Sequence, residues 1–154
     1  MKIAIGSDHR GFEAKEQIKV IVSELGHECV DFGTGDSNPS DYPDMAYLAA
    51  KAVSEKKSDR AILVCATGIG MCITANKIKH VRAALCHDEL SAAISRDHND
   101  CNVLCLSGDQ IGDVMLRKIV EVWLDTEFSG GRHERRVRKI SAIEDGKDPR
   151  SITS

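Results

Sequence analysis

The 154-residue sequence predicts an α/β protein: a three-layer α/β/α sandwich with a five-stranded parallel, Rossmann-like sheet and a C-terminal helix. Two observations predict this fold class. Short apolar segments alternate along the chain with longer segments in which apolar residues recur at helical spacing. Residues 61–65 (AILVC) are also continuously apolar, which is typical of a parallel strand buried on both faces.

The first half of the chain shows the alternation in order. Residues 12–25 are expected to be helical because Ile18, Ile21 and Val22 fall on one face and Gly26 ends the pattern. The five strands are expected at residues 2–6, 28–32, 61–65, 82–86 and 102–106. The helices are expected at residues 12–25, 44–57, 70 to about 79, 88–97, 112–126 and 132–145.

Composition indicates one folded domain, residues 1–154, with a tail that is extended from about residue 146. Apolar residues make up 42% of the chain, and the formal net charge is −3. This balance argues against disorder and against bulk nucleic-acid binding. No apolar run approaches the ~20 residues of a membrane helix, and the N-terminus lacks the pattern of a signal peptide. We therefore expect a cytoplasmic protein without a membrane or nucleic-acid partner.

Six cysteines are a high number for this length, but their spacing excludes two common explanations. There is no Cys-x-x-Cys pair, so neither a zinc ribbon nor a thioredoxin-like motif is expected. Without a secretion signal, a disulfide framework is not expected either. We expect reduced thiols, no metal and no cofactor, with most cysteines acting as small buried hydrophobes.

Residues whose side chains can act in catalysis or ligand binding fall at one end of the predicted strands. In parallel α/β sheets, ligands bind beyond the carboxyl ends of the strands. Asp8 and His9 follow the first expected strand, where the carboxylate can orient the imidazole, and Cys65 and Thr67 lie at the end of the third. Topology therefore places these four residues near one another.

The loop from Cys65 to Cys72 (CATGIGMC) is the sharpest motif in the chain. Its glycines let the backbone approach a ligand, and the N–H groups at the start of the next helix can bind phosphate, carboxylate or an oxyanion. Those N–H groups favour the thiolate of Cys65, which can act as nucleophile or base. The alternatives are a tight turn and a buried strand cysteine; Cys72 itself is expected to be a packing residue.

Two other polar segments remain ambiguous on their residues alone. His98 lies in a polar cluster before the fifth strand, where it can act in chemistry or simply cap a turn. Arg132 and Arg136 lie within the basic run 132–139 and share a helix face, so they can grip one phosphate. The same run can instead be a solvated helix face or a nucleic-acid contact.

Together these motifs resemble the type B ribose-5-phosphate isomerase family, which also includes galactose-6-phosphate isomerase subunits. The resemblance covers nearly the whole chain in the right order. It rests on the segments 3–9 (IAIGSDH), 31–34 (DFGT), 41–43 (DYP), 65–70 (CATGIG), 75–77 (ANK), 82–84 (RAA), 95–99 (SRDHN) and 130–133 (GGRH).

The resemblance implies cofactor-free and metal-free aldose–ketose isomerisation through an enediolate, by a homodimer or tetramer. Cys65 matches the general base, His98 the residue that opens the sugar ring, and Thr67 a hydroxyl that assists proton movement. His98 and Asn99 are implied to enter the site from the partner subunit. The remaining matched positions contact the substrate or its phosphate, or form the anion hole: Asp8, His9, Ala66, Gly68, Ile69, Gly70, Cys72, Asn99, Arg132 and Arg136.

Two departures from the family bear on substrate preference. Ala66 stands where the family usually has glycine, so this position must avoid a positive φ or accept strain. Asp109 stands where an arginine is common, and a carboxylate there cannot bind phosphate. We expect ribose 5-phosphate and ribulose 5-phosphate as substrates. A six-carbon sugar phosphate such as allose 6-phosphate or galactose 6-phosphate, and a non-catalytic phosphosugar-binding module, are the alternatives.

Overall fold

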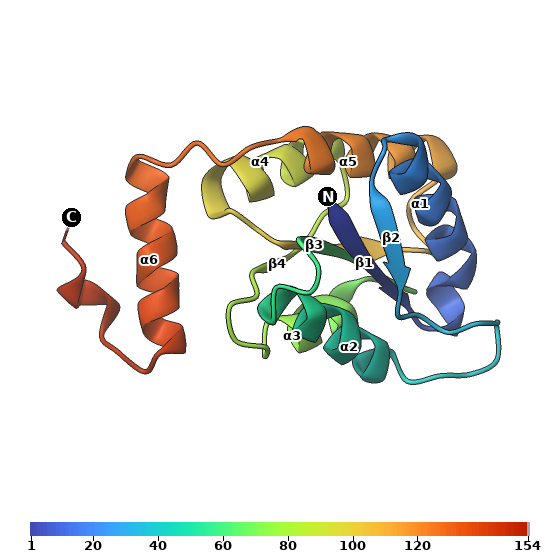
Figure 1. Ribbon diagram of the computed structural model, residues 1–154, viewed down its shortest axis with the longest axis horizontal. Coiled ribbons are helices and arrows are strands. Elements are labelled where there is room, and N and C mark those ends of the chain that lie inside the picture. The colour runs from blue at the N-terminus through green and yellow to red at the C-terminus, as the bar shows by residue number, and fades with distance from the viewer. Residues whose placement is uncertain (154) are drawn as a thin grey trace.

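A five-stranded parallel sheet forms the centre of the computed structural model, which describes residues 1–153 (Figure 1). The strand order is β2-β1-β3-β5-β4, so β3 is central and the chain crosses over between neighbours. The strands are β1 (Lys2–Ser7), β2 (Glu28–Asp31), β3 (Arg60–Cys65), β4 (Ala83–Leu85) and β5 (Val103–Ser107).

Helices cover both faces of the sheet, which confirms the predicted three-layer sandwich. Alternate strand residues supply the two cores: Ile62 and Val64 pack with one set of helices, whereas Ala61 and Leu63 pack with the other. The first set is α1 (Phe12–Glu24), α4 (Glu89–Asn99) and α5 (Asp113–Asp125), and the second set is α2 (Tyr42–Ser54) and α3 (Ile69–Ala75).

The strand predictions are correct to within one residue at either end, but α3 ends four residues earlier than predicted. It ends at Ala75 because the side chain of Asn76 bridges to the neighbouring strand. The Asn76 amide accepts from the Ala83 N–H at 2.9 Å and donates to the Ala83 carbonyl at 2.9 Å. A short 3-10 helix, η1 (His9–Gly11), was not predicted and follows β1 directly.

The last helix, α6 (Arg132–Glu144), lies to one side of the sheet and its covering helices (Figure 1). Its end is tied to the loop after α3 by an ion pair between Lys79 and Asp145 at 2.7 Å. The tail expected to be extended contains a second 3-10 helix, η2 (Pro149–Ser151), whose Pro149 carbonyl accepts from Lys139. No helix within residues 1–153 has the length and apolar character needed to span a membrane.

Candidate functional site

The carboxyl ends of β1 and β3 are brought together by strand register and by one close backbone approach. Ser7 pairs with Val64, so the residues that follow each strand lie at the same edge of the sheet. Gly11 of η1 packs directly on β3, since a Cβ there would meet the Val64 carbonyl oxygen at 2.5 Å. This contact holds the turn that carries Asp8 and His9 beside the end of β3.

Asp8 and His9 each have a partner, but not the one predicted. The Asp8 carboxylate accepts from the backbone N–H groups of Arg10 and Gly11 at 3.0 Å, so it caps η1 instead of orienting His9. The His9 imidazole is held by Ser40, whose backbone N–H lies 3.2 Å from Nδ1. The prediction of an Asp8–His9 pair is therefore wrong, because the loop carrying Ser40 folds over the end of β1.

Cys65 is buried, with 5% of its surface exposed, at the last position of β3. The backbone N–H of Gly68 donates to Cys65 Sγ at 3.2 Å. Gly68 has φ +75°, which an L side chain rarely adopts, and this conformation turns the loop back toward the sulfur. Ala66 is not among the three non-glycine residues with positive φ in the described chain, so it avoids the strain considered above.

The N–H groups of the loop are only partly available to a ligand. The Ile69 N–H points at the Thr67 hydroxyl oxygen at 3.3 Å, and the Cys72 N–H donates to the Gly68 carbonyl at 3.0 Å. Cys72 therefore closes the first turn of α3 through its N–H, which excludes that group from an anion hole. Within residues 1–153, the N–H of Gly70 has no protein acceptor.

The segment after β5 completes this edge of the sheet. The Gly108 N–H donates to the Cys65 carbonyl at 2.8 Å, and the Asp109 N–H donates to the Ala66 carbonyl at 3.2 Å. The Asp109 carboxylate pairs with the Arg10 guanidinium at 2.5 Å, and this hydrogen bond raises the pKa of Arg10. Arg10 was not singled out by the sequence, because its partner lies 99 residues away.

The sulfur of Cys72 has an unusual setting for a packing residue. A hydrogen bond with the Cys105 thiol lowers the pKa of Cys72 to about 7 despite burial, which opposes the shift, and the Asn76 amide adds to the lowering. By contrast, burial raises the pKa of Cys101 to about 12. Cys72, in the first turn of α3, is therefore the thiol in this part of the molecule whose pKa is lowered.

His98 and Asn99 lie near the amino-terminal ends of the strands, whereas Cys65 lies at the carboxyl end of β3. We call the end of the sheet that carries His98 and Asn99 the histidine edge. These two residues end α4, which runs back from the end of β4 to the start of β5. The Asn99 carbonyl accepts from Arg82 Nε at 3.1 Å, directly before β4 begins. Because the six residues of β3 span about 16 Å at roughly 3.3 Å per residue, one chain does not bring His98 to Cys65.

The histidine edge has its own cluster of polar side chains. His98 Nε2 lies 3.2 Å from Asp97 Oδ2, and the His98 ring stacks on the His133 ring with centroids 4.1 Å apart and planes 8° apart. Arg132 and Arg136 lie on the first turns of α6 beside this stack, on one face of the helix as predicted. The predicted site residues therefore fall into two separated groups, one at each end of the strands.

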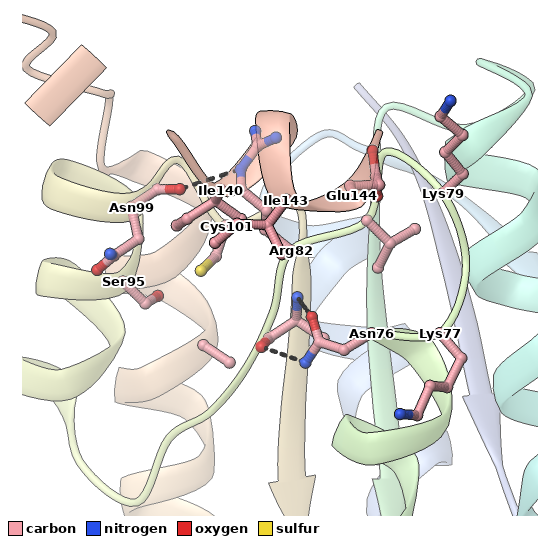
Figure 2. A pocket seen from close by; sticks show the side chains of 13 residues that line it. Asn76, Lys77, Lys79, Arg82, Ser95, Asn99, Cys101, Ile140, Ile143 and Glu144 are labelled. Carbon is pink, nitrogen blue, oxygen red and sulfur yellow. Dashed lines mark hydrogen bonds between the residues drawn. The ribbon is translucent and has the colours of Figure 1, made fainter. Parts of the chain in front are cut away.

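A cavity of about 640 Å³ lies between α6 and the sheet (Figure 2). Ile140 and Ile143 of α6 line it, and Asn76 and Arg82 approach from the α3–β4 side. Ile143 is 61% exposed, although it is apolar. The cavity adjoins the histidine edge through Asn99, which is also part of its lining.

The fold and this geometry define an α/β protein with a buried thiol and a glycine-containing loop at the carboxyl end of its central strand. Within residues 1–153, no cluster of three or more His, Cys, Asp or Glu side chains is arranged to hold a metal ion. A model of the ribose/galactose isomerase family matches residues 3–140. The chain therefore belongs to the ribose/galactose isomerase family and is an aldose–ketose isomerase.

Three relatives show how closely the chain follows this family. It is 44% identical to ribose-5-phosphate isomerase B of Escherichia coli K12, over 93% of this chain and 96% of that protein. It is 42% identical to D-erythrulose-4-phosphate isomerase of Pectobacterium atrosepticum, over 94% and 95% of the two chains. The structure of Mycoplasma genitalium ribose-5-phosphate isomerase B with bound ribulose-5-phosphate matches with a TM-score of 0.89 and 43% identity, over 94% and 96%.

Proposed function

We propose that the protein interconverts D-ribose 5-phosphate and D-ribulose 5-phosphate through an enediolate, with Cys65 as the general base. The observation that carries the proposal is the contact between Cys65 Sγ and the Gly68 N–H at 3.2 Å, at the ligand-binding edge of the sheet. Bound ribulose-5-phosphate in the Mycoplasma genitalium relative supports the choice of a five-carbon substrate.

The isomerisation requires one general base and a set of fixed hydrogen-bond donors to the substrate oxygens. The Cys65 thiolate removes the proton from C2 of the open-chain aldose, and the same sulfur returns a proton to C1. Negative charge that develops on the substrate oxygens is stabilised by N–H groups of the loop, Gly70 among them. The Thr67 hydroxyl, which lies at the start of this loop, carries a proton between O1 and O2.

The ribose substrate first has to open its ring, and we assign this step to His98. The step removes the proton from the anomeric hydroxyl, places a proton on the ring oxygen and breaks the bond between that oxygen and C1. An imidazole can accept and donate protons near neutral pH, which suits it to both transfers. Asn99 lies next to His98 and is proposed as a ligand of the sugar hydroxyls.

We further propose that a working site needs two copies of the chain. His98 and Cys65 belong to opposite edges of one sheet, so the partner subunit has to supply the histidine edge. Apolar side chains are available for the contact: Ile69 and Ile73 of α3 are 52% and 58% exposed, and Leu90 of α4 is 66% exposed. Ile69 and Ile73 lie one turn apart on α3, and contiguous exposed apolar surface marks protein interfaces. The cavity beneath α6 offers room for the partner.

Phosphate binding is assigned to the basic start of α6, and Asp8 and His9 complete the substrate contacts. Arg132 and Arg136 lie four residues apart on one face, so their guanidinium groups can clamp one phosphate. Binding energy from the remote phosphate holds a small, flexible sugar in position relative to the base.

A cytoplasmic location belongs to the same proposal, because a cysteine base must remain reduced.

A coupled isomerase assay with five-carbon and six-carbon aldose phosphates tests the proposal. We expect ribose 5-phosphate to be the best substrate, and Cys65→Ala to lower kcat by about 100-fold or more while calorimetry still detects sugar-phosphate binding. Cys29→Ala, at a cysteine on β2 that is remote from this edge, is the matched control and should leave kcat unchanged. Faster turnover of a six-carbon substrate would reassign the substrate, and binding without turnover would make the protein a phosphosugar-binding module.

A further inference from the structure

The strongest unassigned feature of the molecule is the group of side chains that surrounds His98. The Asp97 carboxylate meets His98 Nε2 at 3.2 Å, and the His133 ring lies parallel to the His98 ring at 4.1 Å. Ser129 fixes Asp97 in turn, because its hydroxyl bonds to the carboxylate and its N–H donates to the Asp97 carbonyl at 3.2 Å. His98 is therefore held at its edge and on one face by residues from three segments of the chain.

His133 differs from an ordinary surface histidine of a basic helix. It is buried, with 7% of its surface exposed, and its Nδ1 atom has no hydrogen-bond partner among residues 1–153. Its Nε2 atom lies 3.4 Å from Arg132 Nε and accepts a hydrogen bond from that N–H group, so Nε2 carries no proton of its own. The ring is consequently a neutral imidazole in this arrangement.

The charge surroundings of His133 keep it neutral. Burial lowers the pKa of His133, and the neighbouring His98, Arg132 and Arg136 lower it further, while Asp97 opposes the shift. Two stacked imidazolium rings would repel each other strongly. A neutral His133 therefore places no second positive charge against the His98 ring, whose other contact is the Asp97 carboxylate at 3.2 Å.

We propose that His133 and Asp97 are positioning residues for His98: the stack and the carboxylate fix the ring whose Nδ1 acts on the sugar. The inference rests on the proposed ring-opening role of His98. It gives Asp97 and Ser129 a function, and it explains why the basic start of α6 carries a flat, neutral ring at position 133. The bond that opens and the two proton transfers are those already written for His98.

Two substrates separate ring opening from the isomerisation that follows. Ribose 5-phosphate is mostly a closed furanose, so its turnover needs the ring-opening step. An aldotetrose 4-phosphate cannot close a furanose ring, because the oxygen that would close it carries the phosphate. A residue that acts only through His98 should therefore affect the first substrate and spare the second.

The experiment compares His133→Ala, His133→Phe and the unaltered protein on both substrates. For ribose 5-phosphate, we expect His133→Ala to lower kcat by about 10- to 100-fold, with KM changed by less than about threefold. On the aldotetrose 4-phosphate, its kcat should stay within about threefold of the unaltered value. His133→Phe restores a flat, neutral ring to the stack and should recover most of the kcat on ribose 5-phosphate. Asp97→Asn should show the same substrate selectivity as His133→Ala.

A double variant distinguishes positioning from direct contact with the substrate. In a His98→Asn background, adding His133→Ala should cost no further activity, because its effect passes through a ring that is already absent. An additional loss, or a rise in KM on both substrates, would mean that His133 binds substrate itself and would overturn the inference. An equal fall of kcat on both substrates would also overturn it. Absence of turnover by the unaltered protein would refute the proposed function as well, and so is recognisable as a different failure.

Discussion

The backbone N–H of Gly68 donates to Sγ of Cys65 at 3.2 Å, and this contact joins the last residue of the central strand to the loop that follows it. The contact exists because Gly68 adopts φ +75°. A side chain there would also collide with its surroundings, since an added Cβ would lie 2.5 Å from Leu85 and 2.8 Å from the Leu106 carbonyl oxygen. Backbone conformation and packing therefore both require glycine.

Gly68→Ala is predicted to destabilise the fold and to remove activity. The positive φ and the overlap with Leu106 together should lower the free energy of unfolding by at least about 2 kcal/mol. Urea unfolding followed by circular dichroism measures the change. Gly112→Ala is the matched control, because nothing lies within 4 Å of its added Cβ and its φ is −76°. A loss at Gly68 no larger than at Gly112 would contradict this account of the loop.

Cys72 is predicted to react with iodoacetamide as a thiolate near neutral pH. Its hydrogen bond with Cys105 lowers its pKa to about 7, so its alkylation rate should rise up to that pH and level off above about pH 8. Peptide mapping by mass spectrometry follows each cysteine separately. Cys101, whose pKa burial raises to about 12, provides an unreactive comparison in the same sample. A Cys72 rate that still climbs about threefold or more between about pH 8 and pH 9 would show an ordinary thiol instead.

Asp31→Asn is predicted to destabilise the protein by about 2 kcal/mol at pH 7. Lys15 is buried, with a side chain only 2% exposed, and its ammonium group lies 2.8 Å from the Asp31 carboxylate. Burial raises the pKa of Asp31, but the hydrogen bonds from Lys15 and Lys19 outweigh it and lower the pKa overall. Neutralising Asp31 leaves the buried ammonium without its main counter-charge.

The effect of Asp31→Asn should depend on pH in a defined direction. A carboxylate with a lowered pKa stabilises the fold above its unfolded pKa, near 3.9, and this contribution is lost as pH falls further. The stability difference between the unaltered protein and the variant should therefore shrink below about pH 4. Glu28→Gln on the same strand is the control, because its pair with Lys2 is exposed. An equal and pH-independent loss in both variants would refute the buried-pair explanation.

The alternation of apolar patterns was enough to predict the sheet and its covering helices. Both strand burial and helix amphipathicity depend on residues that are close together in the sequence. Contacts between distant segments were not predictable in this way. The end of α3 depends on the hydrogen bond between Asn76 and Ala83. The carboxylate of Asp109 accepts a hydrogen bond from Arg10, which lies 99 residues away in the sequence. Ser40, rather than Asp8, holds His9, because a loop whose path the sequence does not specify folds over it.

The placement of the site residues was predicted in part. Strand register put Asp8, His9, Cys65 and Thr67 at one edge, as expected for parallel strands. The stack of His98 on His133 needed the position of α6, which follows a glycine pair and does not take its direction from local pattern. The separation of His98 from Cys65 follows from the strand–helix alternation once the strand order is known.

A site that uses Cys65 of one chain and His98 of another can be detected with mixed oligomers. Cys65→Ala and His98→Asn are unfolded together in equal amounts and refolded, and turnover of ribose 5-phosphate is compared with that of each variant refolded alone. In a mixed dimer, one site receives both substitutions and the other receives neither. Random pairing therefore predicts recovery of about a quarter of the activity of the unaltered protein. A mixture no more active than the average of the two variants would show that each chain works alone, and would contradict the shared site.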